Sequence, residues 1–412
     1  SSVVGHINPP EDDRPVLTVD MSRMRRLLDL NEQNRLATFA AGAAGPHIEA
    51  QLRAHGYTLG HFPQSFEYST LGGWIATRSS GQQSLYYGRI EDLFVGGRLL
   101  TPRGPLDLPP HPASAAGPDL RQLVLGSEGR LGFITQAIVR VRPLPQREDF
   151  HAVFFPEWSP AVEALRELVQ EGVGLSMLRL SDADETRTTL VLAGRERLTA
   201  VMERLLRARG IGPQKCLLLF GATGSEARVQ QARHDALTIC KARGGVHAGR
   251  MMGNEWRKSR FRTPYLRNSL WELGYAVDTL ETAVRWSRVD ALKRDILEAL
   301  RTALQNEGER VLAFAHLSHV YPDGASIYVT YLFRIAPTAD ETLARWQKLK
   351  GAASRAIVAH NATISHQHGV GVDHAPYLAA EKGETGLQAL AALLRTFDPD
   401  GLMNPGKLLP PT

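Results

Sequence analysis

Cysteine is almost absent from this 412-residue sequence, which contains only Cys216 and Cys240. Two thiols are too few for a disulfide framework or a thiolate metal cluster, and they fit a reducing compartment. Long apolar runs are also missing, because no stretch reaches the roughly 18 uncharged residues that a membrane-spanning helix needs. The first thirty residues show no basic segment followed by an apolar one, and we expect a cytoplasmic protein.

Dense positive charge is lacking as well, although the formal net charge is +5. The 48 lysines and arginines are spread along the chain among 43 carboxylates, with no basic run interleaved with aromatics. We therefore predict no nucleic-acid partner. A mild positive field suits an anionic small substrate, and it also leaves peripheral contact with an acidic membrane open. With 43% hydrophobic and 22% charged residues, the composition is that of a globular chain large enough for more than one core.

A domain boundary is predicted near residue 145, where the run RVRPLP follows a proline-rich loop over residues 102–118. Beyond it, strand patterns alternate with amphipathic helical patterns, which favours an α+β or α/β second domain. Strands are expected at residues 16–20, 37–44, 151–155, 188–193, 216–220 and 326–333. Helices are expected at residues 21–30, 161–171, 195–209, 287–307, 343–360 and 386–397.

Two separated stretches are rich in glycine and hydroxyl residues. Residues 64–81 (QSFEYSTLGGWIATRSSG) combine paired glycines with several hydroxyls and an arginine, and residues 126–135 (GSEGRLGFIT) lead from three glycines into an apolar strand. Such stretches place backbone N–H groups around a phosphate or a polar ring. Taken alone, the second stretch is equally compatible with a hairpin turn.

Together these stretches resemble the flavin-binding domain of the vanillyl-alcohol-oxidase-type flavoprotein superfamily. Within it, the alkylglycerone-phosphate synthase (alkyldihydroxyacetonephosphate synthase) family shares residues 65–73, 77–81, 87–93 (YGRIEDL) and 101–104. The resemblance covers nearly the whole chain and implies FAD as the cofactor. The residues implied to contact FAD are Gln64, Ser65, Phe66, Glu67, Tyr68, Ser69, Thr70, Thr77, Arg78, Ser79, Ser80, Glu128, Gly129, Arg130, Leu131, Gly132, Phe133 and Ile134.

The resemblance also implies an α+β organisation. Residues 1–145 are expected to form the second half of a PCMH/VAO-type FAD-binding domain, and residues 146–355 an α+β, ferredoxin-like cap domain that binds substrate. Residues 356–412 are expected to return to the flavin site. Because the family's pyrophosphate loop should precede Ser1, we expect the chain to be a fragment that lacks the N-terminal FAD subdomain.

Tyr328 lies on one face of an alternating strand over residues 320–333 and matches the family's proton-transferring tyrosine. A phenol with an ordinary pKa near ~10 needs a cationic neighbour to act as a base. His366 and His368 stand two apart on the glycine-bounded segment SHQHGVG, which suits proton transfer or oxyanion stabilisation. Gln367 departs from the three consecutive histidines of the family, and an amide cannot take up a proton.

Two arginines complete the expected site. Arg267 matches the family's substrate-binding arginine, since its planar fork of donors suits a phosphate. Arg179 matches an arginine that the family needs for activity. No metal ligand is predicted.

The resemblance implies that an acyl-dihydroxyacetone phosphate exchanges its acyl group for a long-chain fatty alcohol, as in ether-lipid biosynthesis. The substrate would be held covalently at the flavin N5, with no net redox change, and the enzyme is expected to be a homodimer. The alternative is an FAD-linked 2-hydroxyacid dehydrogenase or oxidase of the glycolate or D-lactate type, which the segment FDPDGLMNPGK (residues 397–407) and the pair His368-Gly369 favour. A third interpretation is a flavin-fold or lipid-binding protein without catalysis, motivated by Gln367.

Overall fold

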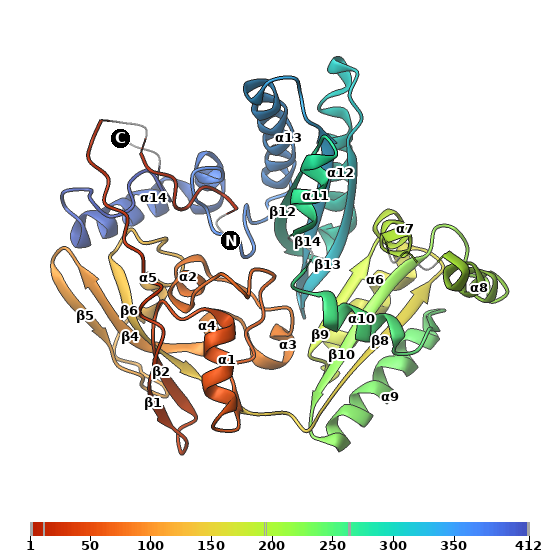
Figure 1. Cartoon of the computed structure of the whole chain (residues 1–412), viewed down its shortest axis with the longest axis horizontal. Coiled ribbons are helices and arrows are strands. Elements are labelled where there is room, and N and C mark those ends of the chain that lie inside the picture. Colours follow the sequence, from red (N-terminus) through yellow and green to blue (C-terminus); the bar gives the residue numbers. More distant parts are fainter. Residues whose placement is uncertain (1–2, 11–12, 193, 195, 263–264, 410–412) are drawn as a thin grey trace. The chain divides into compact units, whose positions relative to one another are not determined.

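The structure is a computed structural model that describes residues 3–10, 13–192, 194, 196–262 and 265–409. The chain divides into two compact units (Figure 1). Unit 1 combines Ser1–Leu144 with Ile364–Thr412, and unit 2 consists of Pro145–Thr363. Each unit packs helices against antiparallel strands, so the predicted α+β class is confirmed. In the described part of the chain, no helix combines the length and the apolar content that crossing a bilayer requires.

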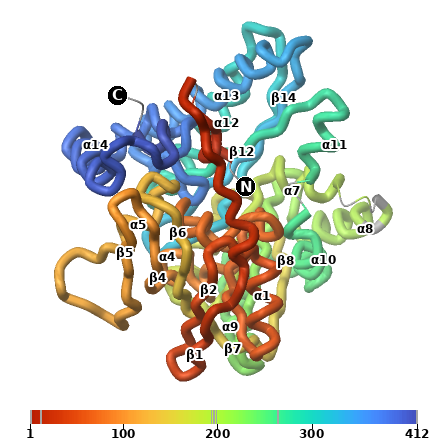
Figure 2. The backbone as a smooth tube through the Cα atoms, turned by 60° about the vertical axis from the view of Figure 1, so that its left-hand side comes forward, coloured from red at the N-terminus to blue at the C-terminus, as the bar shows by residue number. Residues whose placement is uncertain are grey.

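Unit 1 is built on a five-stranded antiparallel sheet with the strand order β1-β2-β6-β4-β5. Its strands are β1 (Leu27–Asn31), β2 (Leu36–Ala40), β4 (Phe94–Thr101), β5 (Gly104–Leu108) and β6 (Phe133–Arg140). Strands β1 and β2 form a hairpin at one edge, drawn in red in Figure 2. A separate small pair joins β3 (Tyr57–Thr58) to β7 (Arg142–Pro143).

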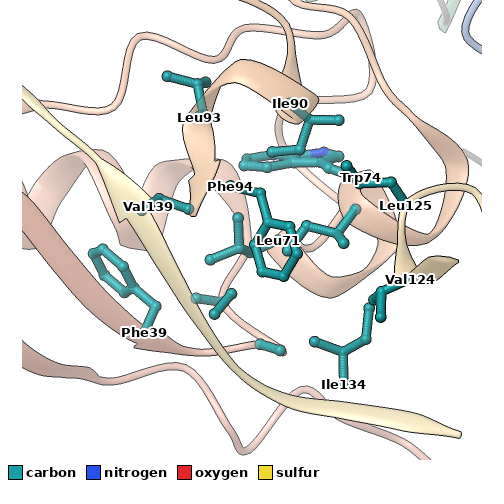
Figure 3. Packing of buried hydrophobic residues seen from close by; sticks show 14 of the residues in the cluster. Phe39, Leu71, Trp74, Ile90, Leu93, Phe94, Val124, Leu125, Ile134 and Val139 are labelled. Atoms are coloured by element: carbon teal, nitrogen blue, oxygen red, sulfur yellow. The ribbon is translucent and has the colours of Figure 1, made fainter. Parts of the chain in front are cut away.

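The core of unit 1 lies where short helices cover this sheet (Figure 3). Phe39, Phe94 and Val139 from three adjacent strands pack with Leu71 and Trp74, and all five side chains are buried. Burying one such side chain contributes on the order of 1.5–3 kcal/mol, so this contact fixes α2 on the sheet. The helices of unit 1 are α1 (Gly45–Arg53), α2 (Leu71–Thr77), α3 (Ser84–Tyr87), α4 (Ile90–Leu93), α5 (Arg121–Val124), the 3-10 turn η4 (Ala375–Tyr377) and α14 (Leu378–Phe397).

Unit 2 is built on a seven-stranded antiparallel sheet with the strand order β11-β8-β10-β9-β13-β14-β12. Its strands are β8 (Arg147–Phe155), β9 (Met177–Ser181), β10 (Cys216–Gly224), β11 (Val246–His247), β12 (Tyr275–Arg285), β13 (Leu312–Tyr321) and β14 (Gly324–Arg334). Its helices are α6 (Trp158–Gln170), α7 (Ala183–Leu192), α8 (Glu196–Arg207), α9 (Glu226–Ala242), α10 (Met251–Ser259), α11 (Leu266–Glu272), α12 (Val289–Thr302), α13 (Ala339–Ala359) and the 3-10 turns η2 (Trp286–Arg288) and η3 (Gln305–Glu307).

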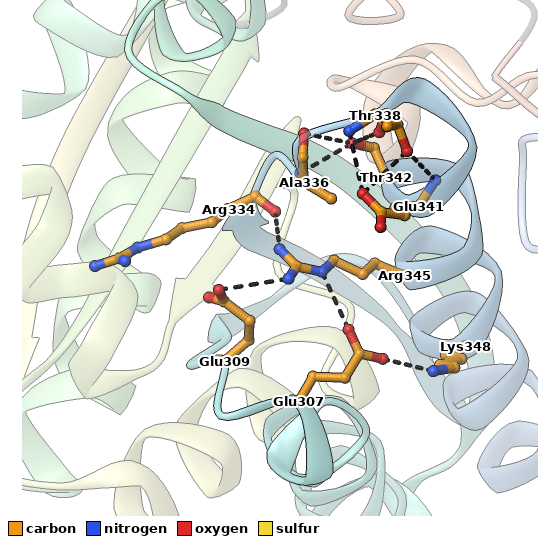
Figure 4. A network of polar contacts seen from close by, with 9 residues as sticks. All are labelled: Glu307, Glu309, Arg334, Ala336, Thr338, Glu341, Thr342, Arg345 and Lys348. Atoms are coloured by element: carbon orange, nitrogen blue, oxygen red, sulfur yellow. Dashed lines mark hydrogen bonds and ion pairs between the residues drawn. The ribbon is translucent and has the colours of Figure 1, made fainter.

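Polar contacts determine where α13 begins and what it packs against (Figure 4). Thr338 and Glu341 form a capping box, in which each side chain accepts a hydrogen bond from the other residue's backbone N–H. One turn later, Arg345 donates to Glu307 at 3.1 Å and to the carbonyl of Arg334 at 3.0 Å. The helix is thereby tied to η3 and to the end of β14.

Three of the expected elements are wrong. Residues 16–20 form no strand, and the helix expected over residues 21–30 is replaced by β1, because residues 27–31 pair with β2. The strand expected over residues 188–193 is part of α7 as far as the described residues extend. This helix begins directly after Asp182, whose carboxylate accepts a hydrogen bond from Glu185 N at 2.8 Å. A helix start of this kind outweighs the strand preference of the residues that follow.

Candidate functional site

Helix α2 and the turn after it present the first of the two predicted flavin stretches. Thr70 caps the helix, because its Oγ1 accepts a hydrogen bond from Gly73 N at 3.2 Å. The helix ends at Arg78, whose backbone is left-handed with a φ of 52°. The chain then turns and buries Ser79 and Ser80. Residues 77–80 therefore form a tight turn at the C-terminal end of α2.

The second predicted stretch docks on this same end of α2. Gly126 N donates to Ile75 O at 3.0 Å, and Glu128 N donates to Ala76 O at 2.9 Å. The Nε of Arg78 also donates, at 3.1 Å, to the carbonyl oxygen that precedes Gly126. Unit 1 thus brings together the two glycine-rich stretches that are far apart in the sequence.

Several predicted flavin residues have side chains that face the protein interior. Phe66 is buried, and Leu131 and Ile134 belong to the hydrophobic core of unit 1. At these positions only the backbone atoms could contact a cofactor, because the side chains are buried in the protein. Tyr68, in contrast, is 71% exposed. The individual contacts of these residues with FAD remain predictions.

Buried polar groups gather around the turn at residues 77–80. The Nε2 of His61 is 3.1 Å from the hydroxyl of Ser79, and its ring packs on Trp74 with the centroids 4.7 Å apart. Burial, assisted by the charge of Arg89, lowers the pKa of His61 to about 3, so the imidazole is neutral. Among the described residues, neither His61 Nδ1 nor Arg130 Nε has a hydrogen-bond partner. Because buried polar atoms are normally paired, the unpaired Nδ1 of His61 fits a polar group bound beside the turn, as FAD would be.

The predicted histidines His366 and His368 lie on a loop of unit 1 that is tied to the second glycine-rich stretch. The carboxylate of Glu128 accepts hydrogen bonds from the backbone N–H groups of Val370 and, at 2.8 Å, of Gly371. Gly371 has a φ of 55°, and a Cβ atom there would lie 1.9 Å from a backbone oxygen, so only glycine fits. Glu128, predicted as a flavin contact, therefore uses its side chain to hold the histidine loop.

Tyr328 lies on β14 and is buried in unit 2. His316, its partner on β13, stacks on the phenol ring with the centroids 4.8 Å apart and 17° between the planes. Burial raises the pKa of Tyr328, and the nearby charge of Arg179 only partly opposes this. The cationic neighbour that we expected is thus present, but it does not lower the pKa of the phenol to the neutral range. Tyr328 remains protonated and is a hydrogen-bond donor.

Arg179, on β9, belongs to the same cluster. Its Nη2 is 2.8 Å from Glu185 Oε1 and 3.2 Å from His316 Nδ1, and these two partners are 2.9 Å apart. Burial alone would raise the pKa of Glu185, but the charges of His316 and Arg179 lower it to about 2. Glu185 is therefore ionised. The structure brings the predicted residues Arg179 and Tyr328 together through His316.

Arg267 is located on α11, a short helix without buried side chains. It is exposed, and the described residues give it no ion pair and no hydrogen bond to the Tyr328 cluster. Trp271, on the same helix, is 55% exposed, and Leu273 just after it is 71% exposed. The helix combines a cation with exposed apolar surface, which suits a ligand with a phosphate and a fatty chain.

Sequence reasoning missed Glu185 and Arg89, and it did not place His316 beside Tyr328. Glu185 lies in the first turn of α7 and His316 lies on β13, and neither element was among those predicted, so the contact between them could not be expected either. Arg89 belongs to the run YGRIEDL, and its Nη1 is 3.3 Å from Nε2 of His366. A lone arginine before a short helix carries no signal of such a long-range contact.

Comparison with known families identifies the class of protein. Residues 144–408 match the C-terminal domain of FAD linked oxidases, and residues 2–106 match an FAD binding domain. The chain therefore belongs to the FAD-linked oxidases, and its cofactor is FAD.

Within this class, the chain is similar to alkyldihydroxyacetonephosphate synthases. It is 32% identical over 417 residues to that of Dictyostelium discoideum, covering 100% of this chain and 68% of the relative. The match to the synthase of Trypanosoma brucei brucei is 31% over 411 residues, covering 98% of this chain and 66% of the relative. A solved alkyldihydroxyacetonephosphate synthase structure superposes with a TM-score of 0.84 at 30% identity, over 99% of this chain and 71% of that one. The chain spans about two thirds of the length of these relatives.

Proposed function

We propose that the protein exchanges the acyl group of an acyl-dihydroxyacetone phosphate for a long-chain fatty alcohol. The observation that carries this proposal is the 32% identity to a synthase of this name along 100% of the chain. In the proposed reaction, the bond between the substrate carbon and the carboxylate oxygen breaks, and a bond to the alcohol oxygen forms. The fatty acid leaves, and the proton of the alcohol is released, so no net oxidation or reduction occurs.

The side chains of unit 2 bind and polarise the substrate in this proposal. Arg267 binds the phosphate, because its guanidinium is exposed and has no ion-pair partner among the described residues. Tyr328 donates a hydrogen bond to a substrate oxygen, because its raised pKa keeps the phenol protonated. Glu185 and His316 hold Arg179 beside the phenol as positioning residues.

The loop that carries His366 and His368 in unit 1 accepts the proton from the carbon next to the substrate ketone in this proposal. A histidine is the side chain best suited to accept a proton near neutral pH, whereas burial raises the pKa of Tyr328 and keeps its phenol protonated, so that its basic form is not available. FAD, when bound, supplies an electrophilic centre that can take up and return an electron pair. The turn at residues 77–80 and the stretch at residues 126–132 are the parts of unit 1 that we propose to hold it.

The proposal is tested with the protein purified with its flavin and kept anaerobic. We expect palmitoyl-dihydroxyacetone phosphate to bleach the visible flavin absorbance with release of palmitate, and hexadecanol to restore the colour and give the ether product. A panel of 2-hydroxyacids should leave the absorbance unchanged. Bleaching by a 2-hydroxyacid alone would instead establish the oxidoreductase alternative. If neither kind of substrate bleached the flavin, the proposal would be refuted in favour of a flavin-fold protein without catalysis.

A further inference from the structure

Arg89 holds both the ring and the backbone of His366. Its Nη1 donates to His366 Nε2 at 3.3 Å, and its Nη2 donates to the carbonyl of the same residue at 3.1 Å. Arg89 is itself fixed, because Nη2 also donates to Arg78 O at 3.2 Å and Nε is 3.1 Å from the carboxylate of Glu91. All four residues belong to unit 1.

A guanidinium group carries only donors and does not lose a proton in proteins. The Nε2 atom that faces it must therefore offer a lone pair, and the single proton of a neutral imidazole must then be on Nδ1. A proton added at Nε2 would place two donors against each other across this 3.3 Å contact. We propose that Arg89 is a positioning residue that holds His366 as the neutral Nδ1–H tautomer.

Other contacts of the loop hold the imidazole ring of His366 in one position. Glu128 anchors the loop four and five residues beyond His366, through the N–H groups of Val370 and Gly371. His374 Nδ1 is 3.0 Å from the carbonyl of Gly369, which closes the same segment on its far side. These contacts fix the backbone that follows His366, so the ring stays beside Arg89, the neighbour that selects its tautomer.

The tautomer assigns different tasks to the two histidines. His366 presents an N–H donor at Nδ1, which suits the stabilisation of negative charge on an oxygen. Accepting a proton is then the task of His368, which lies two residues further along the half-buried part of the loop. This division of tasks rests on the proposed function, whereas the tautomer of His366 does not.

The tautomer is measured directly by two-bond proton–nitrogen correlation NMR on the flavin-loaded protein labelled with 15N-histidine. A His366→Gln variant assigns the resonance. We expect the Nε2 shift of an unprotonated ring nitrogen and the Nδ1 shift of a protonated one at neutral pH. A protonated Nε2, whether in the other neutral tautomer or in the imidazolium, would overturn the proposal. This measurement needs no variant of Arg89, so it remains decisive if such a variant does not fold.

The role of Arg89 is then tested with Arg89→Met, which keeps the length of the side chain and removes every donor. We expect the His366 resonances to shift toward the Nε2–H tautomer and kcat to fall at least tenfold with little change in KM. Arg142→Met is the matched control, because Arg142 packs on the Tyr86 ring of the same unit at 4.8 Å. An unchanged tautomer in Arg89→Met would refute the assignment. A changed tautomer in a protein that never showed alkyl transfer would refute only the proposed function.

Discussion

The neutral, fully buried imidazole of His61 makes the stability of unit 1 depend on pH. Burial lowers its pKa from 6.5 to about 3, whereas the same residue in the unfolded chain keeps an ordinary pKa. Below the unfolded pKa, the unfolded chain binds a proton that the native state does not bind. Stability from this residue is therefore complete above about pH 6.5 and is lost as the pH falls toward the native pKa.

The magnitude follows from the two pKa values. Between about pH 7 and pH 5, protonation of the unfolded chain at His61 lowers the free energy of unfolding by about 2 kcal/mol. Urea unfolding at the two pH values measures this difference. His61→Gln keeps a polar group near Ser79 and removes the titration, so its stability should fall by about 2 kcal/mol less than that of the wild type over the same interval.

The exposed residue His55 supplies the control for this experiment. His55→Gln removes an exposed imidazole from the same unit by the same substitution, and we expect this variant to show the full pH dependence of the wild type. If His61→Gln and the wild type lost the same stability between the two pH values, the reasoning from burial would be refuted.

Three further predictions concern side chains of unit 2. Tyr328→Phe should lower kcat of the alkyl transfer at least 100-fold while the midpoint of urea unfolding moves little, and unchanged turnover would remove the phenol from the proposed chemistry. Glu185→Gln should lower the free energy of unfolding by about 1–3 kcal/mol, as measured in urea, because it leaves the half-buried Arg179 and the buried His316 without their carboxylate. Burial raises the pKa of Cys216 and of Cys240 to about 12, so neither should react with a disulfide reagent until urea unfolds the protein.

Local patterns were sufficient for much of the fold. The alternation that predicted a strand over residues 326–333 lies within β14, and the helix expected over residues 343–360 corresponds to α13. The prediction failed over residues 21–30, since apolar residues spaced for a helix were also compatible with the hairpin that β1 forms with β2. Pairing with a neighbouring strand is a tertiary effect that spacing along one segment does not contain.

The sequence predicted individual segments of the site, but not the contacts between them. The two glycine-rich stretches were recognisable in the sequence, and the resemblance that they carry led to FAD and to Tyr328. The partners that determine their chemistry come from other parts of the chain: the carboxylate of Glu128 reaches residues 370 and 371, and His316 reaches Tyr328 from the neighbouring strand. Contacts of this kind depend on how the chain returns upon itself, which a single sequence does not encode in any local pattern.

Unit 1 is formed by two segments that are separated in the sequence, and this limits the order in which a growing chain can fold. Unit 2 is one continuous segment, whereas unit 1 needs residues on both sides of it. Asn404 donates to the carbonyls of His6 and Glu128, and Lys407 donates to that of Asn8, so these closing bonds use some of the last residues described. During synthesis, unit 2 can therefore fold on the ribosome while the first 144 residues still lack their closing segment. The strands of residues 1–144 therefore wait longest for their closing contacts.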